Sequence, residues 1–191
     1  MAVVEASVAN RQALLSYFRD FFDPDRRESA TTAYLIPDDG GSGYASDVIS
    51  LLLSHDVEVE RAAADFTVEA SDYWSARSSR QTFKAGTWIV RTDQARHVMV
   101  NTLMQRQMEI ESYDMYDMST WSIPLAFNLH GAAWTEATVR VATEAVTEAP
   151  ERVSGVTHPE ARYGFVMDWR QRHAPKALGM LWEAGYQVRE I

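Results

Sequence analysis

The 191-residue sequence contains no cysteine, only two lysines and no long apolar run. The absence of cysteine excludes disulfide bonds, thiolate zinc sites and every thiol nucleophile, but it does not decide the compartment. No apolar stretch approaches the roughly 20 residues that a membrane-spanning helix needs. Residues 1–30 lack the basic start and apolar centre of a signal peptide. We therefore expect neither a membrane span nor a signal sequence.

Acidic residues outnumber basic ones. The chain has 27 Asp and Glu against 18 Lys and Arg, which gives a net charge of −9, and Lys84 and Lys176 are its two lysines. Nucleic-acid binding needs clustered cations that neutralise phosphates, so we expect no nucleic-acid partner. Because 46% of the residues are hydrophobic and 11% are aromatic, the chain can fill a sizeable core.

One stretch of the sequence occurs twice without gaps. Residues 33–61 match residues 162–190, so that Tyr34 corresponds to Tyr163 and Val59 to Val188. Each copy has the pattern of a buried strand, a loop, a helix with an apolar stripe and a second strand. This order is typical of a βαβ unit, in which a helix connects parallel strands and covers the sheet. We therefore predict a three-layer α/β fold of the flavodoxin-like type, a mostly parallel sheet with helices on both faces.

The pattern divides the chain into two parts. Residues 1–30 are predicted to form an N-terminal helix and linker, with the helix over 7–22 ending before Pro24. Residues 31–191 are predicted to form a single α/β domain, in which two βαβ units (31–62 and 162–190) flank a central segment (83–149). Further predicted elements are a helix over 45–54, strands over 32–37, 57–62, 66–70 and 83–92, a helix over 94–107 capped by Asp93, a polar turn over 71–82, and a strand in preference to a helix within 133–149.

The second copy has the same expected elements as the first. We predict strands over 162–168 and 186–190 on either side of a helix over 172–184, which Gly185 ends. A short helix capped by Ser119 and interrupted at Pro124 is predicted between the two units. The matching positions are mostly apolar, so the repeat preserves packing and not a reactive site.

His55 and Glu58 have the spacing of a His-x-x-Glu zinc motif. Such a site takes one imidazole, one carboxylate and a second, distant histidine, and His158 and His173 are candidates for the latter. The alternative is that His55 is the tail of the helix over 45–54, since its counterpart in the second copy is Ala184. The sequence favours this alternative, and we assign no metal site and no catalytic residue.

The valines beside Glu58 support the same choice. Val57 and Val59 alternate with Glu58 in a predicted strand, so the carboxylate points away from the buried valine face. In this arrangement Glu58 would face solvent instead of a metal ion.

Two loops at the carboxyl ends of predicted strands are candidates for ligand binding. The first loop is acidic and glycine-rich, and its candidate residues are Asp38, Asp39, Gly40, Gly41 and Ser42. Backbone amides at the start of the following helix could hold an anion, but the two aspartates would repel phosphate, and the run matches no nucleotide-binding motif. A solvated turn is the favoured interpretation. The second loop contains Asp168 and His173, where the aspartate could orient the imidazole.

Four segments together resemble one family. They are a strand that ends in Ile-Pro (33–37), a VEVERA strand (57–62), a Gly-x-Trp-x-Val strand (86–90) and the run YDMSTWSIPL (116–125). Their order is similar to the region downstream of the catalytic domain in large bacterial zinc carboxypeptidases of the carboxypeptidase A-like superfamily. The resemblance covers most of residues 7–130. Residues 162–190 resemble the start of the class I glutamine-amidotransferase-like portion that often follows there.

The resemblance implies a role without catalysis in this chain. The parent protein would be a secreted or periplasmic zinc metallocarboxypeptidase, with zinc in its catalytic domain and none in this chain. The family's zinc ligands, substrate-binding arginines and general-base glutamate match no position here, and the amidotransferase nucleophile is a cysteine, which this sequence lacks. The expected partners are the catalytic domain of the same polypeptide and a peptide substrate. The alternatives are a zinc peptidase using His55 and Glu58, and a small-ligand-binding α/β domain.

Overall fold

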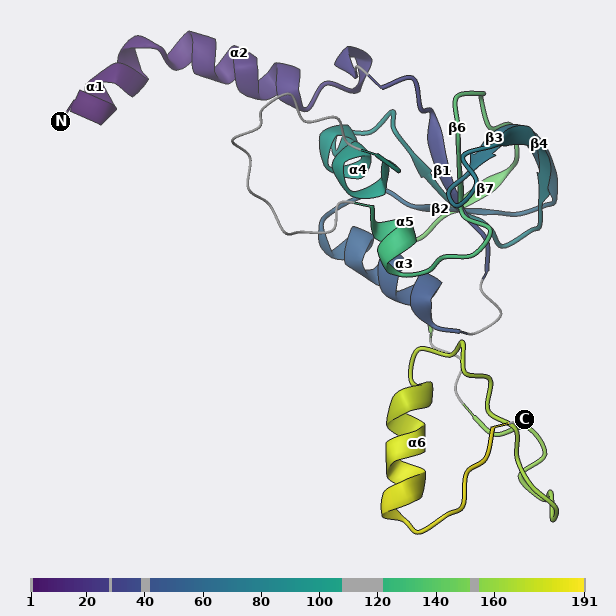
Figure 1. The fold of residues 1–191 in the computed structure, drawn as a ribbon. Helices are drawn as coiled ribbons and strands as arrows, with labels where there is room; N and C mark the ends of the chain where they lie inside the picture. The colour runs from purple at the N-terminus through teal and green to yellow at the C-terminus, as the bar shows by residue number, and fades with distance from the viewer. Residues whose placement is uncertain (1, 28, 39–41, 108–121, 152–154, 191) are drawn as a thin grey trace.

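The computed structural model describes every residue except 1, 28, 39–41, 108–121, 152–154 and 191. A curled sheet forms the body, an arm of two helices projects from it, and a C-terminal unit (residues 162–190) lies beside one end of α3 (Figure 1). The helices are α1 (Ala2–Ala9), α2 (Arg11–Phe21), the 3-10 turn η1 (Pro24–Arg26), α3 (Tyr44–Ser54), α4 (His97–Met104), α5 (Ile123–Ala126) and α6 (Ala174–Glu183). The strands are β1 (Ala33–Ile36), β2 (Glu60–Ala62), β3 (Phe66–Asp72), β4 (Ser78–Phe83), β5 (Trp88–Arg91), β6 (Ala133–Thr135) and β7 (Thr143–Ala145).

The sheet is antiparallel throughout the described residues. Its seven strands lie in the order β4-β3-β6-β1-β5-β2-β7. The central strand β1 pairs with β5 on one side and β6 on the other, so Tyr34 faces Val90 and Trp134 across the two ladders. The predicted mostly parallel sheet, flavodoxin-like or amidotransferase-like, is therefore wrong.

The physical reason is that another strand separates the two strands of the first unit. Strands β1 and β2 run in the same direction, because each pairs antiparallel with β5. Helix α3 connects them, as the sequence predicted, but β5 lies between them, with Ile89 opposite Leu35 on one side and Glu60 on the other. This is a split βαβ unit. Apolar residues in a strand show that it is buried, but they do not show which strand lies beside it.

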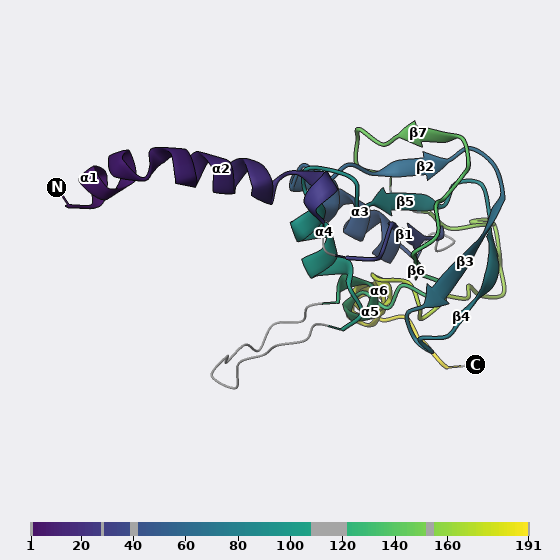
Figure 2. The same cartoon turned by 90° about the horizontal axis from the view of Figure 1, so that it is seen from above.

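Helices cover one face of the sheet, and the sheet itself closes over the other (Figure 2). On the helical face, α3, α4 and α5 pack against Tyr34, Ile36 and Val90. On the opposite face, Leu35 and Ile89 pack against the β3–β4 hairpin, where the Phe66 and Phe83 rings stack 5.4 Å apart. The predicted helices on both faces are thus replaced by a half-barrel with its own interior.

A short connection causes this curl. Strands β2 and β3 follow each other with only residues 63–65 between them, yet three other strands lie between them in the sheet order. Three residues can span the distance from β2 to β3 only if the two ends of the sheet bend toward each other. The half-barrel therefore follows from a single short turn.

The first crossover helix is the best-predicted element. Helix α3 buries Ala45, Val48, Ile49 and Leu52, which are spaced at three and four residues on one helical face. By contrast, α4 begins at His97, with Arg96 and not Asp93 at its cap position. The segment 71–82, predicted as a polar turn, contains most of β4.

Strand β4 was missed because it lies at the edge of the sheet. Its residues alternate weakly, and five of the six are polar, from Ser78 to Thr82. Such an edge strand keeps water on much of its surface and so carries no period-two apolar pattern.

The C-terminal unit does not repeat the structure of the first. Its helix α6 forms and is followed by Gly185, whose φ of 81° suits the end of a helix. Neither 162–168 nor 186–190 forms a strand, and Tyr163 and Val166 are fully or largely exposed. In the first unit β1 gains partners on both sides, whereas no described strand lies beside 162–168. The matching sequences therefore share a helix, but the segments before and after the helix form strands in the first copy and not in the second.

Two smaller predictions can also be placed. Pro124 occupies the first turn of α5, where proline suits a helix, instead of interrupting one. Ser119, the predicted cap, lies outside the described residues. Among the helices of the described residues, none has the length and apolar character to cross a bilayer.

Candidate functional site at the base of the arm

The arm, defined here as residues 2–21, joins the body through a tight polar turn. Helix α2 ends at Phe21, and Asp23 then begins the 3-10 turn η1 by accepting a hydrogen bond from the Asp25 N–H at 3.1 Å. Pro24 lies at the start of this turn, where its missing N–H costs nothing. The chain therefore changes direction at a position that the sequence marks clearly.

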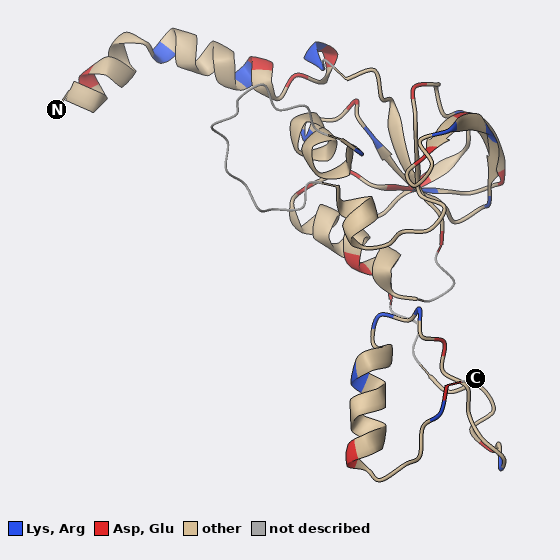
Figure 3. Cartoon of the chain, in the orientation of Figure 1, with Lys and Arg blue, Asp and Glu red and all other residues tan. Residues whose placement is uncertain are grey.

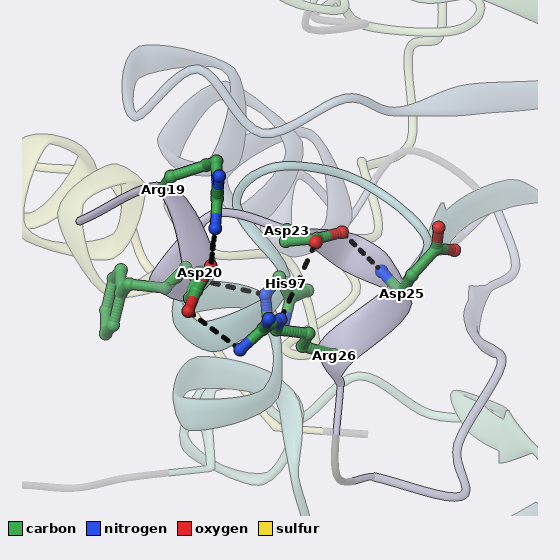
Figure 4. Close-up of polar contacts among 7 residues, drawn as sticks. Arg19, Asp20, Asp23, Asp25, Arg26 and His97 are labelled. Atoms are coloured by element: carbon green, nitrogen blue, oxygen red, sulfur yellow. Dashed lines mark hydrogen bonds and ion pairs between the residues drawn. The ribbon is translucent and has the colours of Figure 1, made fainter. Parts of the chain in front are cut away.

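A cluster of opposite charges surrounds this turn (Figure 4). The Asp20 carboxylate lies 3.0 Å from Arg19 Nη2 and 2.8 Å from Arg26 Nη1, and Arg26 Nε lies 3.8 Å from Asp23 Oδ2. A carboxylate in the last helical turn is disfavoured by the negative end of the helix dipole. The two guanidinium groups offset that repulsion and connect α2 to η1.

His97 links the arm to the body. It is only 6% exposed, and its Nε2 lies 3.1 Å from the Phe21 carbonyl oxygen (Figure 4). A carbonyl oxygen can only accept, so Nε2 carries the hydrogen in this contact. Beside it, the Arg96 guanidinium lies 5.8 Å from the centre of the Phe22 ring. These two contacts fix the base of the arm on the first residues of α4.

A cleft of about 500 Å³ opens between the arm and α4. Its polar lining comprises Asp20, Arg26, Ser29, His97, Asn101, Thr102 and Gln105. Behind it, the Tyr34 hydroxyl donates a hydrogen bond to Asn101 Oδ1 at 3.0 Å, and burial raises the pKa of Tyr34 to about 12. The tyrosine is therefore the donor in this bond, and it ties Asn101 in the cleft lining to the central strand β1.

The chemistry of this cleft suits positioning better than reaction. Its carboxylate already contacts two arginines, and its histidine is engaged with a main-chain carbonyl. Across the described residues, no group of three or more His, Asp or Glu side chains is arranged to hold a metal ion. We therefore regard the cleft as the joint that sets the direction of the arm.

The structure separates the residues of the predicted zinc motif. His55 caps the carboxyl end of α3, and Glu58 is exposed between the buried Val57 and Val59, as the alternation predicted. His158 pairs with Glu160 on the exposed segment before the C-terminal unit. His173 is also exposed and precedes α6.

The ends of α3 explain the distance between these groups. The C-terminal unit touches the start of α3, and eleven residues of helix, about 16 Å, lead from there to His55. The arrangement of His55, Glu58, His158 and His173 thus does not fit a shared metal ion.

The two predicted ligand loops do meet in the structure. The Arg172 N–H donates to the Ser42 carbonyl oxygen at 3.0 Å, and Arg172 Nε lies 2.6 Å from Asp47 Oδ2, on a side chain that is only 8% exposed. Asp38 is exposed, and Asp39, Gly40 and Gly41 lie outside the described residues. The contact between the loops is therefore made by a protein ion pair.

Asp168 has a different partner from the one expected. Both of its oxygens accept from Arg170, with the shortest contact at 2.7 Å, and this hydrogen bonding lowers the pKa of Asp168 to about 2. The hypothesis that Asp168 orients His173 is thus replaced by a local pair on an exposed loop.

Sequence reasoning missed the residues that join the parts of the molecule. His97 lies within the helix predicted over 94–107, where a single histidine gives no motif, and Asp47 is one acid in a first helical turn. A signal was present for Asp47, because Arg172 lies in the loop of the second copy that corresponds to the first. Pairing Arg172 with Asp47 from the sequence would have required the knowledge that the two loops touch.

The chain was also compared with known proteins. A scan against models of protein families, a search of curated proteins and a search of solved structures each found no match. The resemblance to carboxypeptidases therefore depends on the four sequence segments alone.

Those segments can be located on the fold. Residues 33–36 form β1, the VEVERA run leads into β2, and Gly86 lies in the turn before β5 with a φ of 89°. Of the last segment, 116–121 lies outside the described residues, and Ser122 precedes α5. The first three segments are thus neighbours in one sheet.

Proposed function

We propose that this chain is a non-catalytic accessory domain that packs against and supports the catalytic domain of a zinc metallocarboxypeptidase in the same polypeptide. The observation that carries this proposal is the set of large apolar side chains that the described part of the chain exposes to solvent. Apolar side chains left on the surface in such numbers are expected of a part that covers something else.

These side chains are concentrated toward the two ends of the chain. Among the described large apolar side chains that are exposed, Trp74 alone belongs to the body. The others lie in the arm or in the C-terminal region: Val3, Val4, Val8, Leu14, Leu15, Tyr17, Phe18 and Phe21, and Val156, Tyr163, Phe165, Val166, Trp169, Met180, Trp182, Tyr186 and Val188. Several exposed apolar side chains within one segment are typical of interaction sites. The body between them has a complete core of its own.

The resemblance supplies the identity of the partner. In the proposed protein, the catalytic domain holds zinc and binds the peptide, while this chain provides apolar surfaces that stabilise it. The C-terminal unit suits this role, because Trp169, Trp182 and Tyr186 present large aromatic surfaces that favour interfaces.

The first experiment addresses catalysis and metal. The purified 191-residue chain is expected to contain no stoichiometric zinc and to release no amino acid from carboxypeptidase substrates. Zinc content is measured by mass spectrometry after dialysis against zinc, for the natural chain, for His55→Ala, and for His130→Ala as a histidine outside the motif. One equivalent of zinc that is lost in His55→Ala and retained in His130→Ala would overturn the proposal.

The second experiment addresses support of a partner. The reading frame that encodes the chain is expected to encode a carboxypeptidase catalytic domain, and the whole polypeptide is the protein to test. Trp182→Glu should lower the thermal midpoint of the catalytic domain, whereas Trp74→Ser, which removes the exposed aromatic of the body, should not. Equal midpoints for both variants, or a frame without that domain, would contradict the assignment.

A further inference from the structure

Strand β4 forms one edge of the sheet, and no described strand lies on its outer side. It is six residues long and keeps an unbroken register with β3, from Ser78 opposite Ser71 to Phe83 opposite Phe66. The other edge strand, β7, has only three residues. A very short edge strand is protected against pairing with another chain, whereas a long and regular edge can accept a further strand.

The hydrogen bonds of β3 show which of its main-chain groups face β4. The Asp72 N–H donates to the Arg77 carbonyl oxygen at 3.1 Å, so this N–H faces the β4 side. The Glu69 carbonyl oxygen faces the β6 side, because it accepts a hydrogen bond from the Thr135 hydroxyl at 2.6 Å. The two sides alternate along an antiparallel strand, so the even-numbered residues of β3 bond to β4.

The same alternation identifies the outward groups of β4. Its odd-numbered residues lie opposite the even-numbered residues of β3 and bond to them. Ser78, Arg80 and Thr82 therefore direct their N–H and C=O groups out of the sheet. Figure 2 places β4 on the side of the body away from the arm. An extended peptide can pair with these outward groups by continuing the antiparallel sheet.

The edge is basic in a protein that is otherwise acidic (Figure 3). The net charge of the chain is −9, yet residues 77–84 contain Arg77, Arg80 and Lys84 and no acidic residue. Lys84 pairs with Asp65 at 2.8 Å. Arg77 and Arg80 are exposed, and neither guanidinium forms an ion pair or a hydrogen bond with a described residue. Such guanidinium groups beside outward main-chain groups suit a partner that carries carboxylates.

A second copy of the chain does not suit this edge. Two β4 strands paired antiparallel about their common centre would place Arg80 of one copy opposite Arg80 of the other. Like charges directly opposite each other destabilise a sheet, whereas a carboxylate opposite Arg80 forms a favourable cross-strand pair. The charge of the edge therefore favours a different, acidic chain.

We propose that β4 binds an acidic peptide in extended conformation, which adds one antiparallel strand to the sheet. A carboxylate of the peptide lies opposite Arg80, and polar side chains lie opposite Ser78 and Thr82. The main-chain hydrogen bonds provide affinity for any extended chain, and the contact with Arg80 provides the preference for an acidic one.

This inference goes beyond the proposed accessory role and does not depend on it. The accessory role rests on apolar side chains of the arm and of the C-terminal region, whereas the edge belongs to the body. Peptide binding by the 191-residue chain alone tests the edge without a catalytic domain. Its failure would leave the accessory role unaffected.

The first measurement uses the natural chain and a labelled peptide, Glu-Thr-Glu-Thr-Glu-Thr-Glu with blocked ends. Fluorescence anisotropy is expected to give a dissociation constant below about 1 mM, and the peptide with Lys in place of Glu should bind at least about 10-fold more weakly.

Two N-methylated peptides separate strand pairing from simple charge attraction. With a Glu opposite Arg80, the N–H groups of the Glu residues face β4 and those of the Thr residues face away. Methyl groups on the Glu nitrogens should therefore abolish binding. Methyl groups on the Thr nitrogens keep the same charge and should change the dissociation constant by no more than about twofold.

Two variants of the chain locate the site. Arg80→Gln should weaken binding about fivefold, because one cross-strand charge pair is lost. Arg11→Gln, the same change on the arm, should leave binding unchanged. Both side chains are exposed, so circular dichroism and the thermal midpoint should match those of the natural chain. In the complex, hydrogen exchange measured by NMR should slow at the amides of Ser78, Arg80 and Thr82 and stay the same along β7.

Several results would overturn the proposal. One is no binding of the Glu-Thr peptide at about 1 mM. Equal binding of the two methylated peptides would show charge attraction without strand pairing. Unchanged binding by Arg80→Gln would place the peptide elsewhere. Exchange that is already slow at Ser78, Arg80 and Thr82 without peptide, and that speeds up on dilution, would show that a second copy occupies the edge.

Discussion

Gln94 is the side chain whose replacement tests the fold most directly. It is only 5% exposed, and it binds the main chain of Glu58 on both sides: Gln94 Nε2 donates to the Glu58 carbonyl at 3.0 Å, and the Glu58 N–H donates to Gln94 Oε1 at 2.8 Å. The same Nε2 donates to the Arg91 carbonyl at 2.7 Å. The amide thus replaces a strand partner where the chain enters β2.

We expect Gln94→Ala to lower the free energy of unfolding by about 3 kcal/mol, because three hydrogen bonds at about 1 kcal/mol each are lost. Gln94→Glu should cost at least as much, since its carboxylate keeps the acceptor but faces two carbonyl oxygens. The assay is urea unfolding followed by tryptophan fluorescence. The slope of the transition is compared between variants, because an unchanged slope shows that the midpoint reports stability.

The matched control is Gln81→Ala. Gln81 lies on the edge strand β4 and makes one side-chain bond, from its Nε2 to the Ala70 carbonyl at 2.9 Å, so its loss should cost about 1 kcal/mol. If Gln94→Ala proves no more destabilising than Gln81→Ala, the side-chain amide does not act as a strand partner and the reasoning fails.

Two further predictions concern charged groups. Arg172→Leu removes the guanidinium that lies 2.6 Å from the Asp47 carboxylate, so proteases should cut the segment before α6 faster, with a loss of about 1–3 kcal/mol in docking free energy. Arg170→Leu, on an 81% exposed side chain, should leave the rate of cutting unchanged. Hydrogen bonds from Ser75 and Trp74 hold the pKa of Asp72 below its ordinary 3.8, so its stabilising effect is present above that pH and is lost as the pH falls through the lowered value. Asp72→Asn should reduce the loss of unfolding free energy at acid pH, by less than about 1 kcal/mol because the group is largely exposed. Identical acid unfolding curves for the variant and the natural chain would exclude the effect.

Elements whose periodicity reflects burial were predictable from the sequence. The apolar spacing from Ala45 to Leu52 predicted α3, and the alternation of Val57 and Val59 around Glu58 correctly predicted the face of each side chain. Both patterns depend on local geometry, which a sequence records directly.

Strand neighbours could not be predicted in the same way. The composition of β5 does not show whether this strand lies between β1 and β2 or on the other side of β1. Both places are buried on two faces, so both favour the same apolar residues. The internal repeat encouraged a parallel interpretation, since it matched apolar positions without information on pairing. Only the short link over 63–65 hinted that the ends of the sheet must approach each other.

The candidate site was hidden for a related reason. His97 contacts the main chain at Phe21, and Arg172 reaches the main chain at Ser42. A contact to a main-chain group does not depend on the type of the partner residue, so it gives no sequence pattern. The predicted zinc motif had a recognisable spacing, but its residues do not come together in the structure.

The position of β1 has a consequence for how the protein is made. Thr32, which leads into this strand, bonds to the carbonyl of Thr135 at a separation of 103 residues. A nascent chain therefore exposes its most apolar strand until most of the sheet has left the ribosome, and pairings so distant form slowly. Helix α3, which needs only its own neighbours to begin, can cover one side of that strand during the wait.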